Sequence, residues 1–349
     1  MDMTAIDAAL AVLLHKPVQT VARIGKGGNS KVYCVVCEDG SRYAAKFYYQ
    51  RTMDGLDRLD VEFSSLRFLW ENGERCVPQP LAADRRSQIA LYQYVDGVEI
   101  DSRAVSELDI EQLVSFVMRL KRLASLEQAD RLPRAAEACF SFGTLHDNIL
   151  RRLERLNAVD GEGASYAALR PFLTQEFAPA LDAVIGRARV EIGEAAWTAE
   201  LPRSAWTLSP SDFGFHNALR RPDGSIVLLD FEYFGKDDPA KMISDFMLHP
   251  AMDLNESVKR RFAERMLQCF DSDHGLATRL ASSYPLFGLK WCMILLNEFM
   301  PKFLERREFA VEAGADREDV RVRQLVKSQR MLARVMNELE RFAHGAKFA

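Results

Sequence analysis

The pattern of the chain changes near its hundredth residue, and this change constrains the fold more than any other feature. Residues 20–47 are rich in Val, Tyr and Ala and are interrupted by glycines, which predicts β-strands joined by tight turns. A helix is expected at 58–72 and one more strand at 88–95. The rest shows the helical spacing of apolar residues, except for a strand-rich segment at 205–234, and ends in a charged helix at 317–342. We therefore expect an α+β fold with a small β-rich lobe and a large, mainly helical lobe.

Length and composition are those of an ordinary globular protein. The 349 residues carry a formal net charge of −4 and are 48% hydrophobic, so charge gives no indication of a nucleic-acid or membrane partner. The apolar run at 8–14 is too short to cross a bilayer, and the stretch at 286–300 is interrupted by polar residues. The six cysteines show no disulfide or zinc pattern, and Cys34 and Cys37 are interpreted as reduced structural thiols. These features predict a cytoplasmic protein.

A glycine-rich segment at 24–32 lies between two predicted strands. It lacks the Gly-Lys-Ser/Thr ending of a P-loop, and the strand that follows it argues against the dinucleotide-binding fingerprint, which requires a helix there. A glycine-rich hairpin can fold over nucleotide phosphates, because glycine lets the backbone approach them closely. An ordinary turn is the alternative. The positions expected to contact the nucleotide are Gly25, Gly27, Ser30 and Val32.

Lys46 lies in the next predicted strand, fourteen residues after Val32. A hairpin turn at 38–41 brings this strand beneath the glycine-rich segment. In protein kinases such a lysine contacts the α- and β-phosphates and pairs with a glutamate of the following helix. Glu62 is the candidate partner. A lysine extending to solvent and a solvated glutamate are the structural alternative, but the order of the three features favours the functional interpretation.

The strongest signal is the spacing of Asp212, Asn217 and Asp230. Asn217 follows Asp212 by five residues, and Asp230 comes thirteen residues later, at the end of an apolar strand. Phosphoryl transfer needs a carboxylate that accepts the proton of the attacking hydroxyl, and hard oxygen ligands that hold Mg²⁺ across the phosphates. Asp212 is therefore the candidate base, and Asn217 and Asp230 are the candidate metal ligands. Residues 212–214 also spell Asp-Phe-Gly, the metal-binding tripeptide of protein kinases, but the spacing favours the first assignment.

These segments resemble the catalytic region of the aminoglycoside phosphotransferase and choline kinase type of small-molecule kinase. The resemblance spans about residues 21–250 and includes a Gly-x-x-x-Pro…Asp element at 235–245. It implies ATP as phosphate donor, Mg²⁺ as the metal and a small-molecule acceptor. The Ala-Pro-Glu and activation-loop signatures of protein kinases are missing, which argues against a protein substrate.

The resemblance also implies a bilobal protein-kinase-like fold. The N-lobe at 1–97 would contain an N-terminal helix, the glycine-rich loop, a five-stranded sheet, one helix and a hinge. The C-lobe at 98–349 would contain the catalytic loop and the metal-binding hairpin. In the hinge, Gln93, Tyr94 and Val95 would offer backbone groups to adenine, although an ordinary buried strand would look similar.

One position departs from the family pattern. The family usually has a histidine two residues before the catalytic aspartate, where this chain has Pro210. His216 is a candidate substitute that would brace the loop, and an ordinary surface or core histidine is the alternative. Asp245 matches an aspartate that supports the catalytic loop in the family, so a structural role is expected for it.

The expected function is transfer of the γ-phosphate of ATP to a hydroxyl of a sugar, amino sugar or related metabolite. A nucleotide-binding pseudokinase is the main alternative, and transfer of a nucleotidyl group is another. The segments expected to bind the acceptor lack the acid excess that a polycationic aminoglycoside would require. The nature of the acceptor, the choice of ATP over GTP and the oligomeric state stay open. The acids considered for the acceptor pocket, against the alternative of surface acids, are Asp237, Asp238, Asp273 and Glu298.

Overall fold

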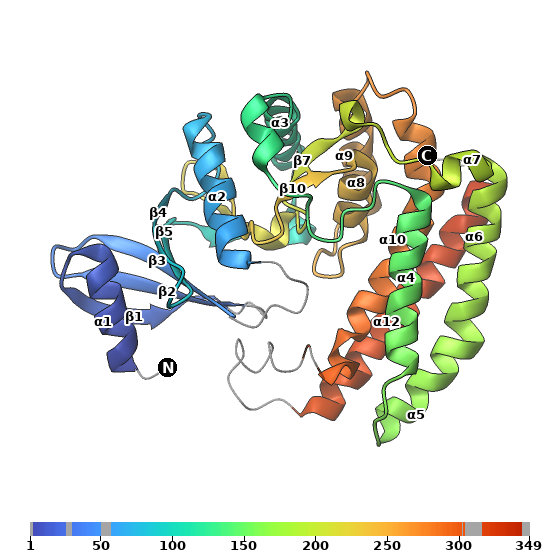
Figure 1. Ribbon diagram of the computed structural model, residues 1–349, viewed down its shortest axis with the longest axis horizontal. Helices are drawn as coiled ribbons and strands as arrows, with labels where there is room; N and C mark the ends of the chain where they lie inside the picture. Colours follow the sequence, from blue (N-terminus) through green and yellow to red (C-terminus); the bar gives the residue numbers. More distant parts are fainter. Residues whose placement is uncertain (1–2, 26–29, 50–56, 302, 304–315, 344–349) are drawn as a thin grey trace.

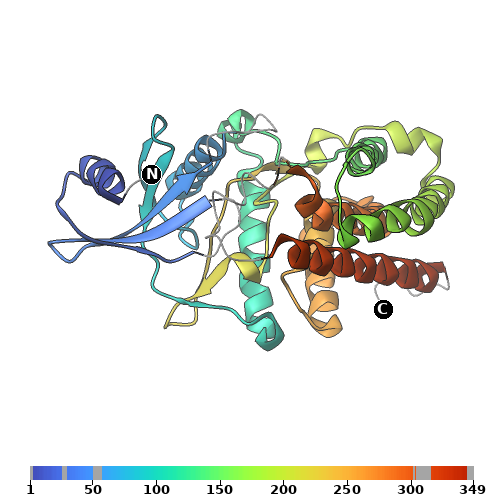
Figure 2. The ribbon, with the colours of Figure 1, turned by 90° about the horizontal axis from the view of Figure 1, so that it is seen from below.

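The computed structural model describes residues 3–25, 30–49, 57–301, 303 and 316–343. A small region built on one antiparallel sheet lies at one end of the molecule, and a larger helical region forms the rest (Figure 1). Figure 2 shows the two regions side by side along the long axis. The α+β architecture expected from the sequence is confirmed, whereas the domain boundary expected at residue 97 stays a prediction.

The sheet of the small region is fully antiparallel, with the strand order β1-β2-β3-β5-β4. Its turn between β2 and β3 is the one expected at 38–41. The five strands that the resemblance implied are present, but the residue pattern did not place β4, because Pro78 and Pro80 lie at its start. Pro80 is tolerated there because it is the first residue of an edge strand, where a missing N–H costs no ladder bond. The strands are β1 (Val18–Arg23), β2 (Ser30–Cys37), β3 (Arg42–Tyr48), β4 (Pro80–Asp84) and β5 (Ile89–Gln93).

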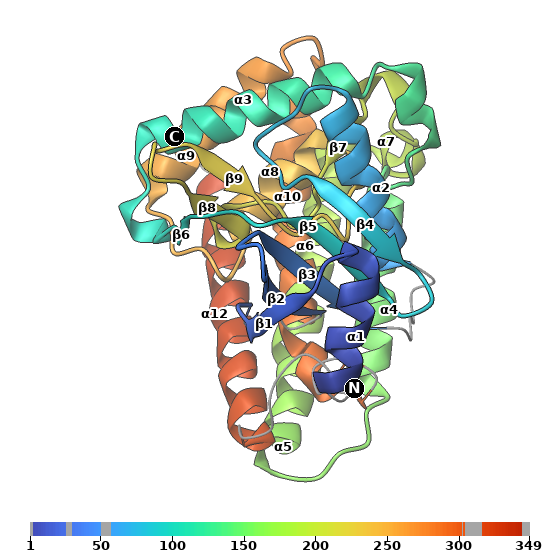
Figure 3. The same ribbon diagram turned by 90° about the vertical axis from the view of Figure 1, so that its left-hand side faces the viewer.

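Helices cover both faces of this sheet. α1 (Met3–Leu14) packs on the outward face against β1 and β4, and Leu10 belongs to the same apolar cluster as Ile89 and Leu91 of β5 (Figure 3). α2 (Arg58–Glu71) packs on the other face, toward the neighbouring residues Ala90 and Tyr92. Side chains alternate between the two faces because successive residues of a strand point in opposite directions. The sheet is thereby held between α1 and α2.

The helical region is organised around α10 (Leu276–Leu295), which is buried over most of its length. It packs against α4, α6, α8 and α12, and α12 coincides closely with the charged helix expected at the end of the chain. Among the described residues, no helix is long and apolar enough to cross a membrane. The other helices are α3 (Glu107–Leu123), α4 (Phe142–Asn157), α5 (Ala164–Pro171), a π-helical stretch (Phe172–Phe177), α6 (Ala178–Ile192), α7 (Glu194–Thr198), α8 (Pro239–Leu248), α9 (Glu256–Cys269) and α12 (Arg317–Ala343).

Two small sheets interrupt the helices and carry the predicted catalytic segment. One pairs β6 (Val98–Glu99), β8 (Ala218–Arg220) and β9 (Ile226–Leu228), and the other pairs β7 (Thr207–Ser209) with β10 (Gly235–Asp237). Asp212 and Asn217 follow β7, and Asp230 follows β9. β7 and β10 lie on the side of the helical region toward the larger sheet (Figure 1), and the contact of Asp230 with Lys46 of β3 joins this segment to that sheet.

Candidate active site

Lys46 is the centre of a buried ion cluster between the two regions. Its Nζ lies 2.6 Å from Glu62 Oε2 on α2 and 2.6 Å from Asp230 Oδ1 after β9. The Glu62 carboxylate also accepts hydrogen bonds from the Tyr48 hydroxyl, at 2.8 Å, and from the Phe231 N–H, at 3.2 Å. Glu62 thus connects the sheet, α2 and the turn that carries Asp230. The pair expected from the sequence is formed.

A third carboxylate, Glu232, completes this cluster. Its side chain is fully buried and lies 3.5 Å from Lys46 Nζ and 3.7 Å from Arg58 Nε. Burial, together with the negative charge of Asp230, raises the pKa of Glu232 to about 7. Burial alone would lower the pKa of Lys46, but the three carboxylates hold it well above its usual value. Lys46 therefore stays protonated and compensates a strongly acidic site.

Asp212 and Asn217 lie in one tight loop after β7. The Asn217 side-chain amide donates from Nδ2 to the Asp212 carbonyl at 3.0 Å, and the Leu229 N–H donates to the Asn217 carbonyl at 2.8 Å. The second bond joins this loop to the strand that leads to Asp230. Because Nδ2 is used in the loop, the Oδ1 atom of Asn217 is the one left for a metal ion.

Two histidines hold the carboxylate of Asp212. His216 Nε2 lies 2.9 Å and His249 Nε2 3.2 Å from the same oxygen, Oδ1. No donor among the described residues contacts the other oxygen, Oδ2, and 30% of the side chain is exposed. Burial raises the pKa of Asp212, but the bonds from the two imidazoles hold it well below its usual value. Asp212 is therefore an ionised, oriented carboxylate with one open oxygen.

The tautomer of His249 follows from its contacts. The Ala251 N–H donates to His249 Nδ1 at 3.2 Å, so the ring proton sits on Nε2 and is directed at Asp212. The rings of His216 and His249 stack at 3.7 Å with an angle of 10° between their planes. The two histidines therefore form a stacked pair beside one oxygen of the Asp212 carboxylate.

Lys241 supports the catalytic loop from α8. It pairs with Asp237 at 2.9 Å and with Asp245 at 3.0 Å, and its Nζ donates to the Ser211 hydroxyl at 3.0 Å. Asp245 also accepts a hydrogen bond from Trp291 Nε1 at 2.9 Å. The structural role expected for Asp245 agrees with these contacts. They reach the loop from the side of α8 and α10 although Pro210 supplies no side-chain donor.

The residues present fit a magnesium ion. Asp230 uses Oδ1 for Lys46 and is one-third exposed, and Asn217 presents its amide oxygen from the neighbouring turn. Carboxylate and amide oxygens are the ligands that Mg²⁺ takes in nucleotide sites. Asp230 adopts the left-handed backbone conformation, with φ of 64°, which is uncommon outside glycine. That conformation turns its carboxylate back toward Lys46.

No known family model and no curated protein sequence matches this chain, but solved structures do. Spectinomycin phosphotransferase APH(9)-Ia, solved with ADP and spectinomycin, superposes with a TM-score of 0.63 and 13% identity, over 92% of this chain and 98% of its own. Choline kinase LicA from Streptococcus pneumoniae gives 0.59 and 16% over 95% and 98%. The gentamicin complex of APH(2")-IIa gives 0.59 and 15% over 95% and 96%. This chain has the fold of these small-molecule kinases. The similarity in fold that the sequence implied is confirmed.

The described residues of the glycine-rich segment lie at the end of β1 and the start of β2, which pair antiparallel. The Gly25 N–H lies 3.4 Å from the Val32 carbonyl, and Ser30 is buried at the start of β2. Gly27 lies outside the described residues. The contact of these positions with a nucleotide stays a prediction.

The expected hinge joins the sheet to β6. The Gln93 N–H is already used, because it donates to the Gln79 carbonyl at 2.8 Å. The guanidinium carbon of Arg42 lies over the Tyr94 ring, 4.6 Å from its centroid, and Val95 is buried. The contribution of these three residues to adenine binding stays a prediction, and Gln93 would have to contribute through an atom other than its N–H.

Three of the acids considered for the acceptor are engaged elsewhere. Asp238 and Asp273 both pair with Arg279, at 2.9 Å and 2.7 Å. Asp237 is fully buried against Lys241, and burial raises its pKa to about 6. Of the two alternatives weighed for these three acids, an acceptor-facing position or a solvated surface position, neither anticipated these contacts. Salt bridges to Lys241 of α8 and Arg279 of α10 use their charges.

Sequence reasoning missed a polar group next to the catalytic loop, made of Glu137, Asn148, Arg152 and Lys290. It also missed His249. No local motif marks these residues, because they come from separate segments that only the fold brings together. Of these residues, Glu137 is marked in the structure by an uncommon backbone conformation, with a left-handed φ of 61°.

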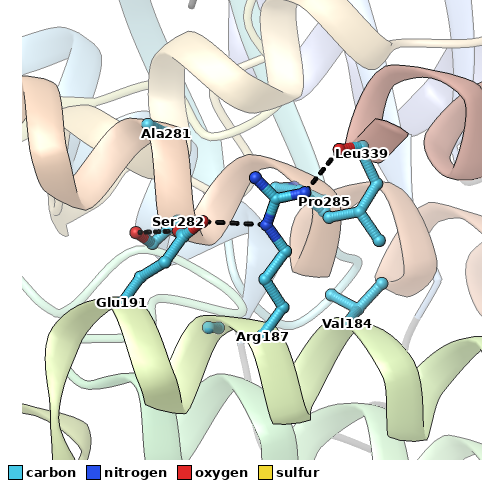
Figure 4. Close-up of a pocket in the computed structure, with 8 residues that line it drawn as sticks. Val184, Arg187, Glu191, Ala281, Ser282, Pro285 and Leu339 are labelled. Carbon is cyan, nitrogen blue, oxygen red and sulfur yellow. Dashed lines mark hydrogen bonds and ion pairs between the residues drawn. The ribbon is translucent and has the colours of Figure 1, made fainter. Parts of the chain in front are cut away.

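One hollow elsewhere in the molecule is filled by the protein's own side chains and is not a candidate active site. It lies among α6, α10 and α12, at the end of the molecule away from the larger sheet (Figure 1). Arg187 fills it, pairing with Glu191 and donating to the Leu339 carbonyl, while Glu191 accepts from Ser282 (Figure 4). Each of these polar groups is satisfied within the protein.

Proposed function

We propose that the protein is a kinase that transfers the γ-phosphate of ATP to a hydroxyl of a sugar, amino sugar or related metabolite. The observation that carries the proposal is the Lys46 cluster beside the open oxygen of Asp212. A phosphate-binding lysine, two oxygen ligands for a metal and an oriented base converge where the sheet meets the helical region. The similarity in fold to phosphotransferases and choline kinases supports it.

The transfer would proceed as follows. The acceptor oxygen attacks the γ-phosphorus and forms the new P–O bond, the bond to the β,γ-bridging oxygen breaks, and ADP leaves. The hydroxyl proton passes to Oδ2 of Asp212, while His216 and His249 keep the carboxylate oriented through Oδ1. Lys46 binds the phosphates in exchange for its contact with Asp230. Asn217 and Asp230 would hold Mg²⁺, which neutralises phosphate charge when bound.

Replacement of Asp212 tests this proposal. Asp212→Asn should lower kcat by about 10²- to 10⁴-fold, the usual contribution of a general base, with little change in the Kd for Mg-ATP. Asp223→Asn is the matched control, because Asp223 caps the exposed turn between β8 and β9. Turnover is measured as ADP release across sugars, amino sugars and amino alcohols, and mass spectrometry of the product identifies the transferred group.

The outcomes separate the candidate functions. A product heavier by one phosphate, lost in Asp212→Asn and kept in Asp223→Asn, supports the kinase. A product that carries a nucleotidyl group would show nucleotidyl transfer in place of phosphate transfer, at the same nucleotide site. Tight Mg-ATP binding without any transferred group across the panel would contradict the kinase and leave a nucleotide-binding module.

A further inference from the structure

Glu137 lies at the meeting point of donors from two helices. Its Oε1 is 2.5 Å from Arg152 Nη2, and its Oε2 is 2.8 Å from Asn148 Nδ2, both on α4. Lys290 Nζ of α10 lies 3.3 Å from Oε2 and also donates to the Glu137 carbonyl at 3.0 Å. Three donor side chains therefore converge on one carboxylate. We call these four residues the Glu137 cluster.

The cluster has more positive than negative charge. Arg152 and Lys290 are 11% and 3% exposed, whereas Glu137, their shared carboxylate, is 41% exposed. The nearby Lys241 adds no free positive charge, because Asp237 and Asp245 both pair with it. Two largely buried cations thus share a single, partly exposed carboxylate.

The cluster lies next to the proposed base. The Ser211 hydroxyl donates to the carbonyl of Ala136 at 3.0 Å. Ser211 precedes Asp212 and Ala136 precedes Glu137, so this bond joins the two segments. On the α10 side, Lys290 precedes Trp291, whose ring meets that of His249 at 4.7 Å. An acceptor whose hydroxyl reaches Asp212 must extend over the helical region, since the Lys46 side is needed for the phosphates. Its other groups therefore come within reach of the cluster.

We propose that Asn148, Arg152 and Lys290 bind a carboxylate or phosphate group of the acceptor, and that Glu137 occupies this subsite until the acceptor enters. The planar guanidinium and the amide of α4 match the two oxygens of such a group. Glu137 is the member that an entering anion would displace, because it is the most exposed of the three charged side chains. Cationic acceptors such as aminoglycosides and choline lack the required charge. This inference rests on the proposed kinase function and narrows its acceptor.

Ligand binding with the nucleotide site filled by Mg-ADP tests the inference without requiring turnover. The probes share one ring: glucose, glucosamine, glucuronate and glucose 6-phosphate. In Glu137→Gln, which frees the donors, glucuronate or glucose 6-phosphate should bind at least about tenfold more tightly than glucose by calorimetry. The carboxylate and phosphate probes distinguish the two sources of negative charge. Glucosamine should bind no better than glucose.

Neutral variants complete the test. In the Glu137→Gln background, Lys290→Met or Arg152→Met should remove the preference for the anionic probe. Arg187→Met is the matched control, because Arg187 makes a comparable ion pair in α6, away from the site (Figure 4). Circular dichroism identifies any variant that fails to fold, and Lys290→Gln then replaces Lys290→Met.

Three results would overturn the inference: equal binding of all four probes to Glu137→Gln, preference for glucosamine, or an anion preference that survives both cation replacements. The proposed kinase function fails separately, through turnover by Asp212→Asn. Anion binding that depends on Lys290, in a protein that transfers nothing, would support the subsite while removing the kinase.

Discussion

The Lys46 cluster and the Glu137 cluster are near opposites in charge. In the first, one buried lysine faces the carboxylates of Glu62, Asp230 and Glu232. In the second, one partly exposed carboxylate faces an arginine and a lysine. An acid-rich site suits a metal that accompanies a polyphosphate, whereas a cation-rich site suits an anion without a metal. The two sides of Asp212 are thus built for differently charged groups, and the variants below test that contrast.

The largest effect is expected from Lys46→Met. The change removes the phosphate contact and leaves three carboxylates uncompensated, so turnover should fall by at least about 10²-fold on every acceptor. Loss of one partner from a buried ion cluster should also cost about 3–5 kcal/mol in the free energy of unfolding. Kinetics and urea unfolding measure the two effects. If Lys46→Met and Lys290→Met gave the same acceptor-independent loss, the contrast between the clusters would not hold.

The next effect concerns His249, which lies between the two clusters. His249→Ala removes a bond to an ionised carboxylate, so kcat should fall by about 10- to 100-fold while the KM for ATP stays constant. His249→Gln should recover part of the loss, because the amide can donate to Asp212. His146→Ala, on α4 beside Trp197, is the control. Equal kcat values for the Ala and Gln variants would show that the hydrogen bond has no positioning role.

A smaller effect is expected from Gly235→Ala, which sharpens the placement of the Glu137 cluster. A Cβ at this position would lie 2.4 Å from the Ala135 nitrogen and 2.5 Å from the Pro133 carbonyl oxygen. Relief of this clash would displace the segment that carries Glu137 from β10, at a cost of about 1–3 kcal/mol. Calorimetry should show the lower stability, and anion binding should weaken while Mg-ADP binding persists. If Gly235→Ala were as stable as the wild type, the close approach of residues 133–135 to Gly235 would be excluded.

The smallest effect is expected at Glu318 of α12, far from both charge clusters. Hydrogen bonds from Ser165 and Arg321 lower the pKa of Glu318 to about 2. A lowered folded-state pKa gives stability that is present above the unfolded pKa, about 4.3, and is lost as the pH falls toward 2. Thermal melting at pH 7, 4 and 3 should show the stability difference between wild type and Glu318→Gln shrinking in this window. A pH-independent difference would contradict the shift.

The features that could be predicted from the sequence are those that depend on interactions between residues close together in the chain. α2 begins at Arg58, where its periodicity predicts, after Asp57 as N-cap, and it is followed by Gly73, whose φ of 85° suits a helix end. The spacing of Asp212, Asn217 and Asp230 predicted that they act together, and the fold brings the segments that carry them side by side. Lys46 and Glu62 could be paired because one hairpin and one helix connect them.

The rest of the site depends on contacts between distant segments. His249 is 37 residues from Asp212, and Arg152 is 138 residues from Lys290. Each looks like an ordinary helix residue in its own segment. The ion pairs of the acids at 237, 238 and 273 were missed for the same reason, since the lysine and arginine that bind them could not be recognised from local patterns. Only packing around α10 determines which charges meet.

The attachment of residues 133–136 to β10 has a consequence for changing what this protein binds. Its hydrogen bonds are backbone to backbone: the Ala135 and Lys236 N–H groups join the segment to β10, and the Ala136 N–H donates to the Tyr233 carbonyl just before that strand. The path of the chain up to Glu137 therefore depends little on which side chains it carries. New side chains at position 137, or at 148 and 152 on the rigid α4, can be installed without moving the catalytic loop. Selectivity for a different acceptor is accordingly an engineering problem of a few exchangeable side chains on a fixed backbone frame.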